Sequence, residues 1–170
     1  MKPGKVLIIR HGEKPGDPGT DALTDGTGLS TKGYERAGAL APYVPATFGK
    51  PDFLFATQAS AHSNRPVETI TPLASAIGLP IHDDHGDNEY GKLASKLISD
   101  EKYAGKLVLI CWHHGKIPEL AAALGGVPPE QHWPPTTFDR VWVLDYTQAS
   151  NTAIPVRNQP QRLLFGDTSQ

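Results

Sequence analysis

The segment Lys106–Trp112 limits the possible folds of this chain more than any other stretch. It reads Lys-Leu-Val-Leu-Ile-Cys-Trp, so apolar side chains would face both sides of the strand that it forms. A strand that is apolar on both faces is typical of the centre of a parallel sheet, where helices cover both sides. A shorter run of the same kind, Val6–Ile9, stands near the start of the chain. Both runs favour an α/β fold.

Helical periodicity fills the stretches between these apolar runs. Apolar residues recur at helical spacing after Ser30 or Thr31, after Pro66, after Glu89 and after Ile117. Pro42 should end or bend the first of these helices; Pro72 should kink the second, and Gly78 should stop it. Further strands are predicted at residues 52–56, 79–81, 140–145 and 161–165.

The composition fits one globular domain over residues 1–170. Apolar residues make up 38% and charged residues 20%, the net charge is −2, and basic runs are absent, which argues against a nucleic-acid-binding surface. Cys111 is the single cysteine, so an internal disulfide is excluded and a reducing compartment is favoured. No signal-peptide pattern and no apolar run of membrane-spanning length occurs. These features predict a cytoplasmic protein that binds neither nucleic acid nor membrane.

Titratable and cationic side chains stand at three junctions between a predicted strand and the segment after it. Arg10-His11-Gly12 follows the first strand, Arg65 precedes a helix, and His113-His114-Gly115 follows the segment 106–112. Ligands of open α/β sheets bind at the carboxyl ends of the strands. Arginine donors match phosphate or carboxylate, and a histidine can act as a nucleophile or a base near neutral pH. Each junction alone also fits a surface arginine or a structural histidine; together they indicate an anion site.

Taken in order, the motifs resemble those of the histidine phosphatase superfamily, also called the phosphoglycerate-mutase-like family. The family's Arg-His-Gly-Glu start matches Arg10–Glu13, and its Leu-Ser-x-x-Gly-x-x-x-Ala helix matches Leu29–Ala37. Its second arginine, with a threonine four residues on, matches Arg65 and Thr69, and its late His-Gly pair matches His114-Gly115. The resemblance extends from residue 5 to residue 145. It implies a small single-domain member with a three-layer α/β sandwich and a largely parallel central sheet, in which the strands ending at Arg10 and Trp112 are neighbours.

The resemblance also implies roles for individual residues. His11 would attack phosphorus and become a phosphohistidine, which splits hydrolysis into two easier steps. Arg10, Arg65 and His114 would bind the phosphoryl oxygens, with Gly12 and Glu13 beside them in the substrate-binding site. No metal or cofactor is needed, because the cations supply the electrostatic stabilisation.

A carboxylic acid should protonate the leaving oxygen and later activate water. Glu89 is the first choice for this acid, and Asp87 and Asp84 are alternatives.

His113, next to His114 at the end of a strand, should point away from the site. The Gly- and Pro-rich stretch Lys14–Gly28 is long enough to border the site as a cover.

The function that these features predict is hydrolysis of a phosphate monoester, with a small phosphorylated molecule or a phosphoprotein as substrate. The motifs define the phosphoryl-transfer groups but not the leaving group or the oligomeric state. A regulatory protein that binds a phosphorylated ligand without turnover is one alternative. A phosphoglycerate-mutase-type phosphotransferase is another, although the chain lacks the Trp-Asn that follows Arg-His-Gly-Glu in mutases. A metal-dependent hydrolase built on His82, Asp83 and His85 is a third.

Overall fold

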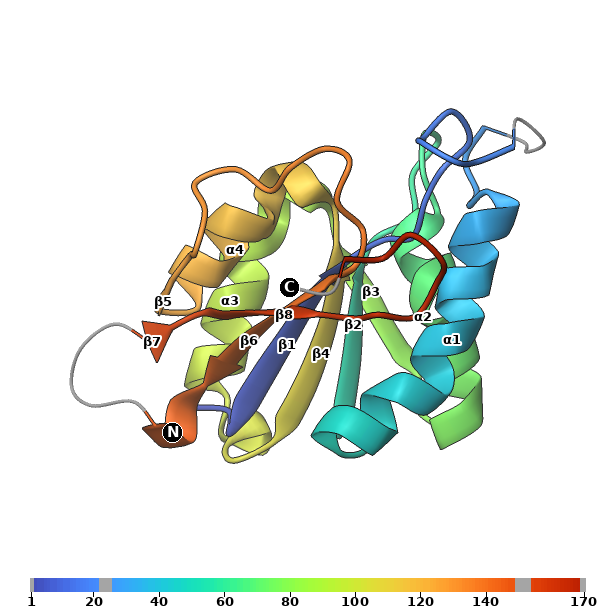
Figure 1. Cartoon of the computed structure of the whole chain (residues 1–170). Helices are drawn as coiled ribbons and strands as arrows, with labels where there is room; N and C mark the ends of the chain where they lie inside the picture. Colours follow the sequence, from blue (N-terminus) through green and yellow to red (C-terminus); the bar gives the residue numbers. More distant parts are fainter. Residues whose placement is uncertain (1, 22–25, 149–153, 169–170) are drawn as a thin grey trace.

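The computed structural model describes residues 2–21, 26–148 and 154–168 of the chain. Within these residues, six strands form a central sheet in the order β3-β2-β4-β1-β6-β8 (Figure 1). The strands are β1 (Lys5–Arg10), β2 (Phe53–Thr57), β3 (Ile81–His85), β4 (Leu107–Trp112), β6 (Arg140–Asp145) and β8 (Arg157–Pro160). Strands β1 to β4 run parallel, whereas β6 is antiparallel to β1 and β8 is antiparallel to β6. A small second sheet pairs β5 (Gly126–Val127) with β7 (Ile154–Pro155).

The register between β1 and β4 sets the position of the expected site. Arg10 lies opposite Trp112, and the His11 amide donates to the Trp112 carbonyl at 3.2 Å, so both strands end at the same edge of the sheet. The prediction that these two strand ends are neighbours is confirmed.

Helices cover both faces of the sheet, which confirms the predicted three-layer sandwich with a mostly parallel sheet (Figure 1). Side chains of Leu7 and Ile9 pack in one buried cluster with α1 (Thr31–Phe48) and α2 (Arg65–Ile77). Side chains of Val6 and Ile8 pack on the opposite face with α3 (Tyr90–Ser99) and α4 (Ile117–Ala123). Burial of each such aliphatic side chain stabilises the fold by about 1.5–3 kcal/mol.

Two helix boundaries follow the sequence signals closely. Ser30 is the N-cap of α1, and its hydroxyl accepts a hydrogen bond from the Gly33 amide at 3.1 Å, as expected for a capping serine. Gly78 ends α2 with φ of 70°, in the left-handed region that glycine adopts without strain.

Three element boundaries differ from the expected ones. Helix α1 does not end at Pro42 but continues to Phe48, because Leu40 and Val44 on either side of the proline are both fully buried and hold the helix against the sheet. Strand β3 begins at Ile81 and includes the residues that follow, since the backbone of this polar stretch pairs with β2.

The edge strand is β8, not residues 161–165. It reads Arg-Asn-Gln-Pro and has no apolar alternation, so its pairing rests on backbone hydrogen bonds to β6 that periodicity does not reveal. No helix of the described ranges has both the length and the apolar character needed to span a membrane.

Candidate active site

An open cleft of about 450 Å³ lies where the parallel strands end, and it collects the side chains of the three sequence junctions. Its lining residues are Arg10, His11, Lys14, Ser60, His62, Ser63, Arg65, Asp87, His113, His114 and Gly115. The residues come from the ends of β1 and β4, from the start of α2, and from the segment that precedes α3. The structure therefore brings together Arg10, His11, Arg65 and His114, which the sequence placed in one anion site.

The His11 side chain is only 4% exposed, and a single hydrogen bond defines its protonation state. Its Nδ1 lies 2.8 Å from the Gly12 carbonyl oxygen, which can only accept, so Nδ1 carries the proton and Nε2 holds the lone pair. Burial holds the pKa of His11 well below its usual range; nearby His113, Arg10 and Arg65 act in the same direction, although the Gly12 carbonyl opposes them. The imidazole is thus neutral at physiological pH, as a nucleophile must be.

Hydrogen bonds join Gly12, just after β1, to the first turns of α2. Its amide donates to Thr69 Oγ1 at 2.8 Å, and the Thr69 hydroxyl donates to the Arg65 carbonyl at 2.7 Å. A Cβ atom at Gly12 would lie 2.9 Å from the Gly33 carbonyl oxygen, so the close packing of α1 requires glycine here. The Gly12 amide is thus already bonded to Thr69, and Gly12, expected in the substrate-binding site, is not among the residues that line the cleft.

Arg10 is held by the loop that precedes β6. Its Nη1 donates to the carbonyl oxygens of Pro135 at 2.7 Å and Thr137 at 3.1 Å, and its guanidinium lies 3.7 Å from the centre of the Phe138 ring. Burial lowers the pKa of Arg10 to about 10, despite the opposing charges of Asp17 and Glu13, so the side chain remains cationic at neutral pH. The loop therefore fixes a positive charge beside His11.

Arg65 connects the cleft to the Gly- and Pro-rich stretch that was expected to border it. Its Nε donates to the Gly28 carbonyl at 2.9 Å and its Nη2 to the Gly26 carbonyl at 2.6 Å. Lys14, at the other end of the stretch, lines the cleft. Residues 22–25 of this stretch lie outside the described residues.

His113 points into the cleft, which corrects the expectation that it would point away. Its ring centre lies 5.2 Å from that of His11, with the planes at 70°. The register explains this: His11 and His113 each follow a paired residue of two neighbouring parallel strands, so their side chains leave the sheet on the same side. Burial, with Arg65 and Arg10 nearby, lowers the pKa of His113 to about 4. The order of the motif, with His114 next to glycine, did not reveal this.

His114 also lines the cleft, and burial together with the charge of Arg10 lowers its pKa. Both histidines of the pair, His113 and His114, therefore line the cleft. His113 is the one whose ring contacts His11.

Of the three candidate acids, only Asp87 lines the cleft. Burial raises the pKa of Asp87 above its usual value, against the lowering effects of Lys116 and Trp112, and the Trp112 indole donates to the Asp87 carbonyl at 3.2 Å. Glu89 instead accepts from Lys92 at 2.5 Å and from the Gly86 amide at 2.9 Å. Asp84 pairs with Lys96 at 3.3 Å. Glu89, the first choice from the sequence, therefore lies outside the cleft lining, whereas the alternative Asp87 lies in it.

Glu13, expected beside the substrate, lies outside this cleft. Its carboxylate is buried and forms an ion pair with Arg36 at 2.7 Å. The candidate metal cluster is not formed either. Among the residues that the structure describes, no three His, Cys, Asp or Glu side chains are arranged to hold a metal ion, and this includes His82, Asp83 and His85.

Solved structures similar to this chain include phosphatases and a mutase, whereas no protein-family model and no curated protein sequence matches it. Phosphoserine phosphatase from Entamoeba histolytica, in complex with 3-phosphoglyceric acid, has a TM-score of 0.58 at 15% identity, over 94% of this chain and 99% of that chain. Protein histidine phosphatase SixA complexed with tungstate has a TM-score of 0.55 at 17% identity, over 91% and 94% of the two chains. Phosphoglycerate mutase from Plasmodium falciparum has a TM-score of 0.55 at 14% identity, over 98% and 97%.

The chain has the phosphoglycerate-mutase-like fold. The fold that the sequence motifs imply is thus the fold that the structure has. In this phosphoglycerate-mutase-like fold, the cleft at the strand ends holds the buried imidazole of His11 and the partly buried imidazole of His113 next to two arginines.

The lowered pKa values of the His11 and His113 imidazoles predict a loss of stability in mild acid. The folded-state pKa values of His11 and His113 lie below the unfolded value of 6.5, so the unfolded chain binds more protons once the pH falls below 6.5. The free energy of unfolding should therefore decrease between pH 6.5 and about pH 4, by roughly 3 kcal/mol for His113 alone. Urea unfolding at pH 7 and pH 4 measures this loss, and His113→Asn should reduce it; an unfolding free energy independent of pH would contradict the assignment.

Proposed function

We propose that this chain is a phosphatase that hydrolyses phosphate monoesters through a phosphohistidine intermediate on His11. The observation that carries the proposal is the state of the His11 imidazole. Its Nδ1–H is bound to the Gly12 carbonyl, its pKa is lowered, and its ring lies in a cleft with Arg10, Arg65 and His113. A neutral imidazole with a free Nε2 among cations is suited to attack a phosphoryl group.

In the first step, Nε2 of His11 forms a bond to phosphorus while the bond from phosphorus to the leaving oxygen breaks. Asp87, whose pKa burial raises, donates a proton to that oxygen. Arg10 and Arg65 offset the charge on the phosphoryl oxygens, and His113 and His114 lie beside them. In the second step, the Asp87 carboxylate takes a proton from water as the water oxygen attacks phosphorus, and His11 is released.

The cleft is open and lined by polar side chains, which favours a substrate that inserts its phosphate group while the rest of the molecule stays outside. Its lining holds hydroxyl, imidazole, lysine, arginine and carboxylate side chains around the two arginines. The tungstate complex of SixA supports the binding of a tetrahedral oxyanion by this fold. The two kinds of similar phosphatase, one acting on protein histidine and one on phosphoserine, support either a phosphoprotein or a small phosphorylated molecule as substrate.

Hydrolysis of p-nitrophenyl phosphate in the presence of EDTA tests the proposal. The arginine cations should make turnover independent of metal, so activity should persist in excess chelator. Loss of activity on chelation, with recovery on adding a divalent cation, would contradict metal-independent hydrolysis. Tungstate binding without any turnover across a panel of phosphorylated metabolites and phosphopeptides would favour the alternative, a regulatory phospho-ligand-binding protein.

A further inference from the structure

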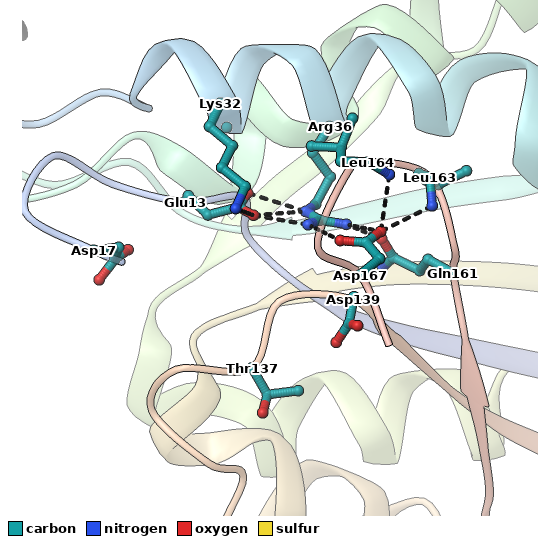
Figure 2. Close-up of polar contacts among 12 residues, drawn as sticks. Glu13, Asp17, Lys32, Arg36, Thr137, Asp139, Gln161, Leu163, Leu164 and Asp167 are labelled. Carbon is teal, nitrogen blue, oxygen red and sulfur yellow. Dashed lines mark hydrogen bonds and ion pairs between the residues drawn. The ribbon is translucent and has the colours of Figure 1, made fainter. Parts of the chain in front are cut away.

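Arg36 on α1 has an unusually complete set of partners for a side chain that is only 2% exposed. Its Nε and Nη2 donate to Glu13, at 3.0 and 2.7 Å. Its Nη1 and Nη2 donate to Asp167, at 3.0 and 2.8 Å, and Nη1 also donates to Gln161 at 2.9 Å. Figure 2 shows the guanidinium between the two carboxylates. All five N–H groups of the arginine are thereby used.

The Glu13 end of this network is attached to the loop that orients His11. The Gly12 carbonyl accepts the Nδ1–H of His11 at 2.8 Å, and the next carbonyl, that of Glu13, accepts from the Ser30 amide at 2.9 Å and from its hydroxyl at 3.0 Å. The backbone of Gly12 and Glu13 thus lies between the nucleophile and the start of α1. The side chain of Glu13 is held in addition by its ion pair with Arg36.

The Asp167 end belongs to the segment Gln161–Thr168, which follows β8 without forming a helix or a strand. Asp167 Oδ2 accepts from the amides of Leu163 at 2.8 Å and Leu164 at 3.1 Å, so the segment folds around this carboxylate (Figure 2). Asp167 and Arg36 are 131 positions apart in the sequence.

The same segment also reaches the loop that holds Arg10. The Thr168 amide and hydroxyl donate to Asp139 Oδ2 at 2.6 and 2.9 Å, and the Gln161 amide donates to the Asp139 carbonyl at 2.9 Å. Asp139 directly follows Phe138, whose ring supports the Arg10 guanidinium. The segment therefore contacts both the loop after His11 and the loop that orients Arg10.

We propose that the segment Gln161–Thr168 is a positioning element of the active site, and that Arg36 and Asp167 are the positioning residues through which it orients His11. The inference rests on the proposed function of the cleft. Asp167 orients Arg36, Arg36 holds Glu13, and Glu13 fixes the peptide whose Gly12 carbonyl selects the His11 tautomer. The ion pairs keep Arg36 charged, because the carboxylates of Asp167 and Glu13 raise its pKa despite the burial that lowers it.

Asp167→Asn is the test variant, since Arg36→Ala would leave the buried Asp167 carboxylate without an ion pair and the buried Glu13 carboxylate with only Lys32, at 4.0 Å, which endangers folding. We expect kcat for p-nitrophenyl phosphate to fall by about 10- to 100-fold, the scale of a small misplacement of reacting groups. The Kd for tungstate should change by less than about threefold, because the groups that contact the anion remain charged and present. Asp145→Asn is the matched control: it removes a carboxylate from an ion pair with Lys5, at 3.4 Å, at the start of β1 and so at the opposite end of this strand from His11, and should leave kcat unchanged.

A second readout separates positioning from mere stabilisation and does not depend on turnover. Nitrogen NMR of His11 should show the Nδ1–H tautomer in the wild type and a mixture of tautomers in Asp167→Asn, while thermal unfolding shows that the variant remains folded. A wild-type tautomer and an unchanged kcat in the folded variant would overturn the inference but leave the phosphatase assignment intact. If the wild type lacked turnover, the proposed function would fail, and the tautomer of Asp167→Asn would still decide the positioning role.

Discussion

Replacing His11 with alanine is expected to reduce turnover of p-nitrophenyl phosphate to background while the chain still folds and binds tungstate. The imidazole forms the covalent bond to phosphorus in the proposed mechanism, and no neighbour can take its place. The His113 ring lies near that of His11, but it is held at a different position, after the end of β4, and lines another part of the cleft. The loss should be on the order of 10⁴–10⁶-fold, as for removal of the nucleophile from other enzymes that form covalent intermediates.

Tungstate binding by calorimetry distinguishes loss of chemistry from loss of the site. Arg10, Arg65, His113 and His114 remain in His11→Ala, so the anion should still bind. His132→Ala is the control, because His132 is exposed and lies outside the cleft lining. Turnover in His11→Ala within tenfold of the wild type would show that this imidazole is not the nucleophile.

The second large effect is expected at Asp87 and depends on the leaving group. Asp87→Asn removes the proton donor, so the first step with phosphoserine, whose alcohol leaves poorly without a proton, should slow by about 10²–10⁴-fold. The first step with p-nitrophenyl phosphate should change little, because the nitrophenolate leaves unprotonated. The second step lacks its base, so p-nitrophenol should appear in a burst followed by a slow phase.

Glu89→Gln is the matched comparison, since this carboxylate lies on the exposed surface next to Lys92. It should leave both substrates at wild-type rates. Equal slowing of the first step for the two substrates by Asp87→Asn, or a leaving-group-dependent effect of Glu89→Gln, would reverse the assignment of the acid. These rates are measured on the wild type, Asp87→Asn and Glu89→Gln. Stopped-flow absorbance follows p-nitrophenol release, and a separate assay follows phosphoserine hydrolysis.

The parts of the fold set by local pattern were predictable from the sequence. The run 106–112 is the central strand β4, and residues 140–145 are β6, because apolar runs and their polar limits are local properties. Helix α1 begins after Ser30 and α2 ends at Gly78, as capping chemistry predicts. The polar residues of β3 and β8 were missed because they lack an apolar alternation, although their backbones pair with β2 and β6.

The sequence predicted which strand-to-loop junctions form the site, but not which individual side chains of those junctions enter the cleft. The presence of His113 in the cleft depends on the register of β4 against β1, which adjacency to glycine does not encode. The preference for Asp87 over Glu89 depends on a short 3-10 turn, Asp87–Glu89, that brings one carboxylate to the cleft and leaves the other with Lys92. The pairing of Glu13 with Arg36 and Asp167 joins distant parts of the chain.

The central claim is that His11 carries the phosphoryl group, and rapid quenching with radiolabelled p-nitrophenyl phosphate tests it most directly. The wild type should yield an acid-labile, base-stable adduct that maps to the peptide containing His11. The phosphate should be on Nε2, because the Nδ1–H is bound to the Gly12 carbonyl. An adduct on another residue, or turnover with no trapped phosphoenzyme and no label on His11 at any quench time, would contradict this account.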